Sequence, residues 1–130
     1  MISNDNIEIY QGNSLSFGFR VTDNDGQPKS FAGCSARCQI RLSPDSAIPI
    51  AEMSTINGGI TLATGLLTLV MSPMQTEALD FSGAPLGQAI VNGITVSGMK
   101  AEYDIQVAQA DGNVVTLERG FVIFVKGITR

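Results

Sequence analysis

The feature that most constrains the fold is a strict two-residue alternation of apolar and polar side chains in three separate segments. Residues 34–42 carry apolar side chains at every even position, and residues 15–22 and 101–108 carry them at odd positions. This period is typical of a β-strand with one buried face and one solvated face. With residues 66–71 and a short helix after them, these faces predict a core made of Leu15, Phe17, Phe19, Val21, Cys34, Ala36, Cys38, Ile40, Leu42, Leu67, Leu69, Met71, Leu79, Tyr103, Ile105 and Val107.

Short apolar runs bounded by turn residues recur about every ten residues along the chain. Fourteen glycines and five prolines in 130 residues supply the turns, and the Asp-Gly pairs at 25–26 and 111–112 predict hairpins between the flanking strands. This spacing predicts an all-β, immunoglobulin-like antiparallel β-sandwich of seven to nine strands, folded as one domain over residues 1–130. The additional predicted strands lie at residues 7–9, 48–53, 59–63, 66–71, 114–119 and 121–126.

One segment departs from the β pattern. Ser72 is a helix N-cap residue, Pro73 suits the first helical position, and Gln75 stands three residues after the cap. We therefore expect a helix from Pro73 to Leu79 that bridges the two sheets, with Met74 and Leu79 filling the core.

The chain contains no histidine. This excludes Ser-His-Asp and Cys-His nucleophilic sites, and zinc sites ligated by histidine. The net charge is -4 and there is no basic run to follow a phosphate backbone, so nucleic acid is not an expected partner. We expect a non-enzymatic protein without a cofactor.

The residues that could bind a metal ion form incomplete patterns. Cys34 and Cys38 lie about 13 Å apart along one predicted strand, too far for a disulfide, and no further Cys or His completes a zinc site. Both are expected to be free thiols that face the core. Residues 23–26 resemble the start of a calcium loop, but Cys34 stands at the twelfth position, where a carboxylate is required. Binding of an incidental surface ion at residues 23–26 is an alternative that stays open.

Carbohydrate chemistry would require a pair of carboxylates, and Glu102 and Asp104 are the candidates. They share the solvated face of one predicted strand, with α-carbons about 7 Å apart. No aromatic residue accompanies them in the sequence, and Tyr103 lies on the core side. Carbohydrate binding therefore stays open without positive support.

No stretch is apolar for long enough to cross a membrane, because Thr or Gly interrupts even residues 60–71. Residues 1–6 have neither the basic nor the apolar region of a secretory signal. We expect the protein to fold in a reducing cytoplasm and not to insert into membranes.

Residues 80–99 are unusual because they contain no Lys, Arg or Glu. Within them, two β-branched runs flank Asn92-Gly93, which is the strongest short-range signal for a hairpin. Two interpretations stay open: an ordinary sandwich hairpin with one face in the core, or an inserted arm that projects and pairs with a neighbouring subunit. In the second, the protein interface consists of Ala89, Ile90, Val91, Asn92, Gly93, Ile94, Thr95 and Val96.

A series of short motifs follows one another along the chain. They are Tyr10-Gln11-Gly12-Asn13-Ser14, Asp25-Gly26-Gln27-Pro28, Cys38-Gln39-Ile40-Arg41, Ile60-Thr61-Leu62, Leu67-Thr68-Leu69, Tyr103-Asp104-Ile105, Asp111-Gly112-Asn113-Val114 and Gly127-Ile128-Thr129-Arg130. This series resembles a group of small phage and prophage proteins encoded near tail and tail-fibre genes. The layout is also similar to the immunoglobulin-like N-terminal domain of siphophage baseplate upper proteins.

This resemblance implies a virion structural protein, namely a β-sandwich adaptor of the tail or baseplate that attaches subunits or fibres. Its partners would be other virion proteins and copies of itself. If the arm of residues 89–96 projects, symmetric self-association in a trimer or higher ring around a tail axis is the simplest closed arrangement. A capsid decoration (cement) protein and a carbohydrate-binding module that aids adsorption to the host are the alternatives. The resemblance also implies folding in the host cytoplasm before assembly into the virion.

Overall fold

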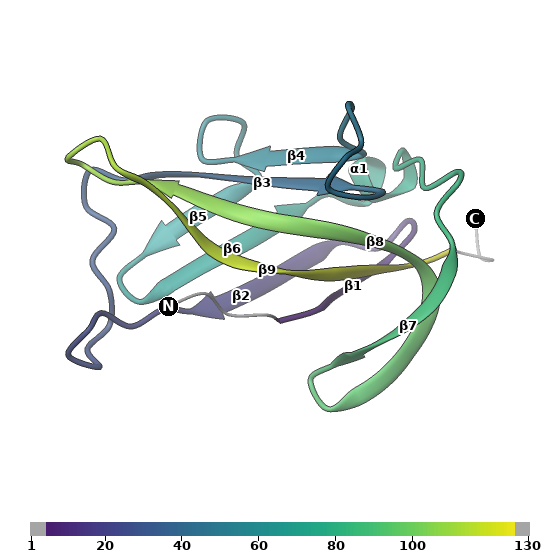
Figure 1. Ribbon diagram of the computed structural model, residues 1–130, viewed down its shortest axis with the longest axis horizontal. Helices are drawn as coiled ribbons and strands as arrows, with labels where there is room; N and C mark the ends of the chain where they lie inside the picture. The colour runs from purple at the N-terminus through teal and green to yellow at the C-terminus, as the bar shows by residue number, and fades with distance from the viewer. Residues whose placement is uncertain (1–4, 127–130) are drawn as a thin grey trace.

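Residues 5–126 are described by the computed structural model and form two β-sheets packed face to face (Figure 1). The larger, sheet A, has the strand order β1-β9-β8-β3-β4, with β7 paired to β8, and the smaller, sheet B, has the order β2-β6-β5. The elements are β1 (Ile7–Tyr10), β2 (Leu15–Arg20), β3 (Ser35–Arg41), β4 (Ala51–Ser54), β5 (Ile60–Ala63), β6 (Leu66–Met71), α1 (Pro73–Glu77), β7 (Leu86–Val91), β8 (Ile94–Ala108) and β9 (Val114–Val125).

The strand order confirms the predicted immunoglobulin-like sandwich with one short helix. In that fold the two sheets contain the orders B-E-D and C-F-G, which β2-β6-β5 and β3-β8-β9 reproduce here. One pair departs from the antiparallel expectation, because β1 runs parallel to β9 from Ile7 opposite Val122 to Tyr10 opposite Val125. The motif Gly127-Ile128-Thr129-Arg130 lies outside the described residues.

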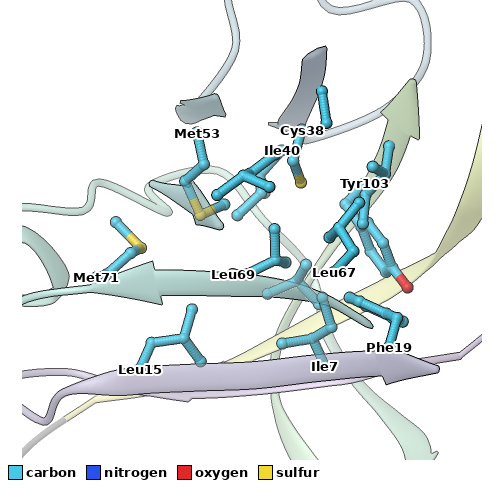
Figure 2. Packing of buried hydrophobic residues seen from close by; sticks show 14 of the residues in the cluster. Ile7, Leu15, Phe19, Cys38, Ile40, Met53, Leu67, Leu69, Met71 and Tyr103 are labelled. Atoms are coloured by element: carbon cyan, nitrogen blue, oxygen red, sulfur yellow. The ribbon is translucent and has the colours of Figure 1, made fainter. Parts of the chain in front are cut away.

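Side chains from both sheets interlock in the core, as Figure 2 shows for Leu67 and Leu69 of β6 facing Cys38, Ile40 and Tyr103 of sheet A. All the predicted core residues are buried except four that are half-buried: Phe17, Cys34, Leu42 and Leu79. Cys34 and Leu42 flank the ends of β3, and Phe17 lies on an edge strand. The core also contains residues not predicted to belong to it, including Phe31, Met53, Ile60, Phe81, Val122 and Phe124.

The helix begins as predicted but presents a different residue to the interior. The Ser72 hydroxyl accepts from the Gln75 amide at 3.2 Å, and Gln75 Oε1 accepts from the Ser72 amide at 2.7 Å, which completes a capping box. The helix ends at Glu77, and Met74 is 84% exposed, so the expectation that Met74 fills the core is wrong. The buried residue of this short helix is Thr76 instead.

Three other expectations need correction. The turn at residues 23–27 closes only on itself, through a bridge between Thr22 and Pro28, and β2 and β3 then enter different sheets instead of forming a hairpin. The predicted strands on either side of Gly120 form one continuous strand, β9. Gly120 does not form a turn there; it leaves room for the Asp5 carbonyl, which packs closely against the strand. The predicted strand 48–53 begins only at Ala51, after Pro49, which has no amide to donate.

Thr76 links the helix to the β1–β2 turn, and its replacement by Val should destabilise the protein. Its buried hydroxyl donates to Asn13 O at 2.8 Å and accepts from the Gly12 amide at 3.1 Å. Thr76→Val keeps the shape but leaves both backbone groups without this partner, so we expect a loss of about 1–3 kcal/mol in the free energy of unfolding, measured by urea denaturation.

The matched control is Thr76→Ser, which keeps the hydroxyl and removes one methyl group, at a cost of about 1 kcal/mol. Wild-type stability in Thr76→Val, or a larger loss in Thr76→Ser than in Thr76→Val, would contradict the role assigned to the hydroxyl.

Candidate functional site: the inserted arm

The predicted Asn92-Gly93 hairpin is present and is an extension of sheet A. It consists of β7, the turn, and residues 94–99 of β8, and is called the arm here. Asn92 and Gly93 have φ values of 50° and 81°, which a two-residue type I′ turn requires. In Figure 1 the arm continues beyond the sandwich from β8 and curls under sheet A. In sequence, the arm stands between α1 and the part of β8 that belongs to the sandwich. It is therefore an addition to the strands that form the two sheets of the sandwich.

The two faces of the arm differ in exposure. On the face that includes Ala89 and Val91, both of these side chains are buried and Val96 is half-buried. The opposite face of β7 exposes Leu86 and Ile90 by 83% and 61%. The arm therefore packs one face on its own chain and leaves the other open.

This division corrects part of the predicted interface. Ala89 and Val91 are already buried within the single chain, so a partner cannot cover them as expected. The predicted residues that remain exposed are Ile90, Asn92, Gly93, Ile94 and Thr95, with Ile94 67% exposed beside the turn. Leu86, which lies before the predicted interface, is more exposed than any of the predicted apolar residues.

The outer edge of β7 is partly capped by side chains of the same chain. In an antiparallel pair, alternate residues turn their backbone groups away from the partner strand, and on β7 these include Gln88 and Ile90. The Gln88 carbonyl accepts from Lys100 Nζ at 2.9 Å, and the Ile90 carbonyl accepts from Asn6 Nδ2 at 3.0 Å. We expected this edge of β7 to be unpaired, but at these two positions it is not. A partner strand is therefore less able to add to the sheet by hydrogen bonding along β7.

Lys100 and Asn6 also fasten the arm to β9. The Lys100 ammonium lies 4.0 Å from the centre of the Phe121 ring, a cation–π contact, and Asn6 Oδ1 accepts from the Phe121 amide at 3.0 Å. Gly87 makes room for the lysine stem, since a Cβ there would lie 2.7 Å from Lys100 Cδ. A Cβ at Gly98 would lie 2.6 Å from the Phe124 carbonyl oxygen, so this glycine lets β8 pass close to β9.

Sequence reasoning missed Asn6 and Lys100 as part of this site. The available signal was that Lys100 is the first charged residue after the uncharged segment, two residues beyond Gly98. Asn6 lies 84 residues from Ile90 in sequence, and no local pattern connects them.

The cysteines and Tyr103 have the environment of packing residues. Both cysteines are free, as predicted, with Cys38 buried and Cys34 half-buried. Burial raises the pKa of the Cys38 thiol well above its usual value, and burial together with the nearby charge of Glu118 raises the pKa of Tyr103. Both groups are therefore neutral near pH 7, and the Tyr103 hydroxyl donates to the Asp5 carbonyl.

The candidate calcium-loop segment forms a turn stabilised by its own carboxylate. Asp23 Oδ1 accepts from the amides of Asp25 and Gln27 at 2.9 and 3.0 Å. Across residues 5–126, no three His, Cys, Asp or Glu side chains are grouped as metal ligands would be. No helix in this part of the chain has the length and hydropathy needed to span a bilayer.

No family model matches the sequence, and no curated protein matches it significantly. The resemblance to phage virion proteins therefore stays a hypothesis that rests on the motifs quoted above.

Removing the Lys100 ammonium should loosen the arm without unfolding the sandwich. Lys100→Met keeps most of the apolar stem but loses the hydrogen bond to Gln88 and the contact with Phe121. We expect the amides of Ala89 and Val91 to exchange with deuterium about two- to tenfold faster, while core amides of β3 keep their rates. Lys29→Met is the matched control, because Lys29 lies over Phe31, away from the arm. Equal arm exchange in both variants would rule out the fastening role of Lys100.

Proposed function

We propose that this protein is a non-enzymatic structural adaptor of a phage tail or baseplate, which attaches to other virion proteins or to copies of itself through the arm. The observation that carries the proposal is the exposure of Leu86, Ile90 and Ile94 on a segment without Lys, Arg or Glu. Leu86 and Ile90 share one face of β7, whereas Ile94, directly opposite Val91, lies on the other face beside the turn. Exposed apolar side chains on such a segment favour a protein contact, because water solvates them poorly. The motif resemblance and the rigid β-sandwich support the virion setting.

The contact would extend beyond the arm. A stable interface buries about 800 Å² on each partner, more than three aliphatic side chains can present, so the sandwich surface beside the arm would contribute its rim. Because the β7 edge is capped at Gln88 and Ile90, the contact would use the side chains of the exposed face more than the backbone. Symmetric association in a closed ring is the simplest arrangement for identical copies.

The position in the particle is tested by immunogold labelling of purified virions with antibodies against this chain. The adaptor proposal expects gold at the tail tip or baseplate. Label distributed over the head would support capsid decoration instead, and absence of the chain from purified particles would reject the virion role.

Charges on the exposed face of the arm should abolish association while the fold is retained. In Leu86→Lys/Ile90→Lys, each ammonium is solvated in the monomer but would be desolvated in the contact. We expect sedimentation velocity to show a shift from oligomer to folded monomer, or particles to lose the chain. Ile56→Lys is the matched control, since Ile56 is 93% exposed and lies outside the arm. Association that survives in the double variant, or fails equally in the control, would reject the arm as the contact.

A further inference from the structure

The outer face of sheet A contains a groove of about 670 Å³ that is distinct from the exposed face of the arm. Its floor is formed by outward-facing side chains of β3, β8 and β9, and Asn6 and Pro44 lie at its sides. This volume falls within the range of about 300–1,000 Å³ typical of small-ligand sites.

The strand register arranges the floor in two rows across the three strands. In one row Glu102 lies opposite both Arg41 and Phe121, and in the other Asp104 lies opposite Gln39 and Arg119. Directly opposite residues have Cβ atoms about 4.5–5.5 Å apart, so each row is a continuous strip of side chains. The aromatic residue that the sequence did not reveal beside the carboxylates is therefore Phe121, brought there by β9.

One side of the groove is held by internal bonds, and the middle is open for binding. Arg41 donates to Ser46 O at 2.6 Å and to Gln39 Oε1 at 2.9 Å, and Gln39 Nε2 donates to Glu52 at 2.8 Å. Within residues 5–126, the side chains of Glu102, Asp104 and Arg119 make no hydrogen bond or ion pair. The two carboxylates are half-buried, and their oxygens are acceptors available to a ligand.

We propose that this groove binds a neutral oligosaccharide. Among the lining residues, the charges of Arg41 and Arg119 balance those of Glu102 and Asp104, so the lining itself favours neither an anionic nor a cationic ligand. The nearby Lys100 ammonium is engaged by the Gln88 carbonyl and the Phe121 ring. Sugar hydroxyls donate to carboxylates and accept from a guanidinium, which is the combination that Glu102, Asp104 and Arg119 offer. The Lys100 ammonium lies over one face of the Phe121 ring, and the part of the ring that is exposed, 39% of the residue, provides an apolar surface for the C–H face of a sugar ring.

The site is assigned to binding and not to glycoside cleavage. Glu102 and Asp104 lie two residues apart on one strand and project side by side from the same face of the sheet. Glycoside hydrolysis needs two carboxyl groups that flank the scissile bond from opposite sides, which this placement does not provide.

The test is an NMR titration of the ¹⁵N-labelled full chain with maltotriose, cellotriose and tri-N-acetylchitotriose. We expect at least one of these probes to give saturable shifts of the amides at Asp104, Arg119 and Phe121 at millimolar concentration. Asp104→Ala and Phe121→Leu should each weaken that binding about tenfold, because one removes a charged acceptor and the other the aromatic ring. Asp25→Ala is the matched control, as Asp25 is an exposed carboxylate outside the groove.

The absence of saturable shifts with all three sugars up to about 20 mM would overturn the proposal, since that limit corresponds to negligible affinity. Binding unchanged in both groove variants, shifts confined to other surfaces, or tighter binding of a sulfated trisaccharide would overturn it as well. Leu86→Lys/Ile90→Lys should bind the sugar as the wild type does, so this result is independent of the arm contact.

Discussion

The pairing of β8 with both β3 and β9 is the interaction on which the rest of the structure depends. The inward side chains of β8, such as Tyr103, Ile105 and Val107, are buried at the centre of the core. The alternate residues Glu102 and Asp104 form the middle of the outer groove, and the same strand continues into the arm. Any shift in the register of β8 would move core, groove and arm together, because a slip of one residue exchanges the two faces of a strand.

The arm shows how a segment without charge is kept on a sheet edge by residues outside it. Asn6 and Lys100 satisfy two edge carbonyls of β7, and buried Val91 holds the inner face. Small residues at Gly87 and Gly98 let the lysine stem and the β9 backbone approach closely. The exposed side chains therefore lie on a segment that is fixed at several points. Less conformational entropy is then lost when a partner binds to them.

The two candidate surfaces have opposite chemistry although both belong to sheet A. The arm exposes aliphatic side chains and no charge, which suits a contact with another protein surface. The groove presents balanced charges around an aromatic ring, which suits a hydroxyl-rich ligand. Phe121 lies between them, because its ring contacts Lys100 of the arm base and lines the groove. Asn6 likewise contacts the arm and lines the groove.

The sequence by itself determined features that arise within a few residues of chain. These are the alternating faces of β2, β3 and β8, the capping box at Ser72, and the type I′ turn at Asn92-Gly93. Only the tertiary structure decided which strands share a sheet, that Val91 is buried, that Asn6 and Lys100 cap β7, and that Phe121 lies beside Glu102. The physical reason is that local periodicity specifies which side chains share a face, whereas strand order and register depend on burying all the apolar faces at once, between residues far apart in the chain.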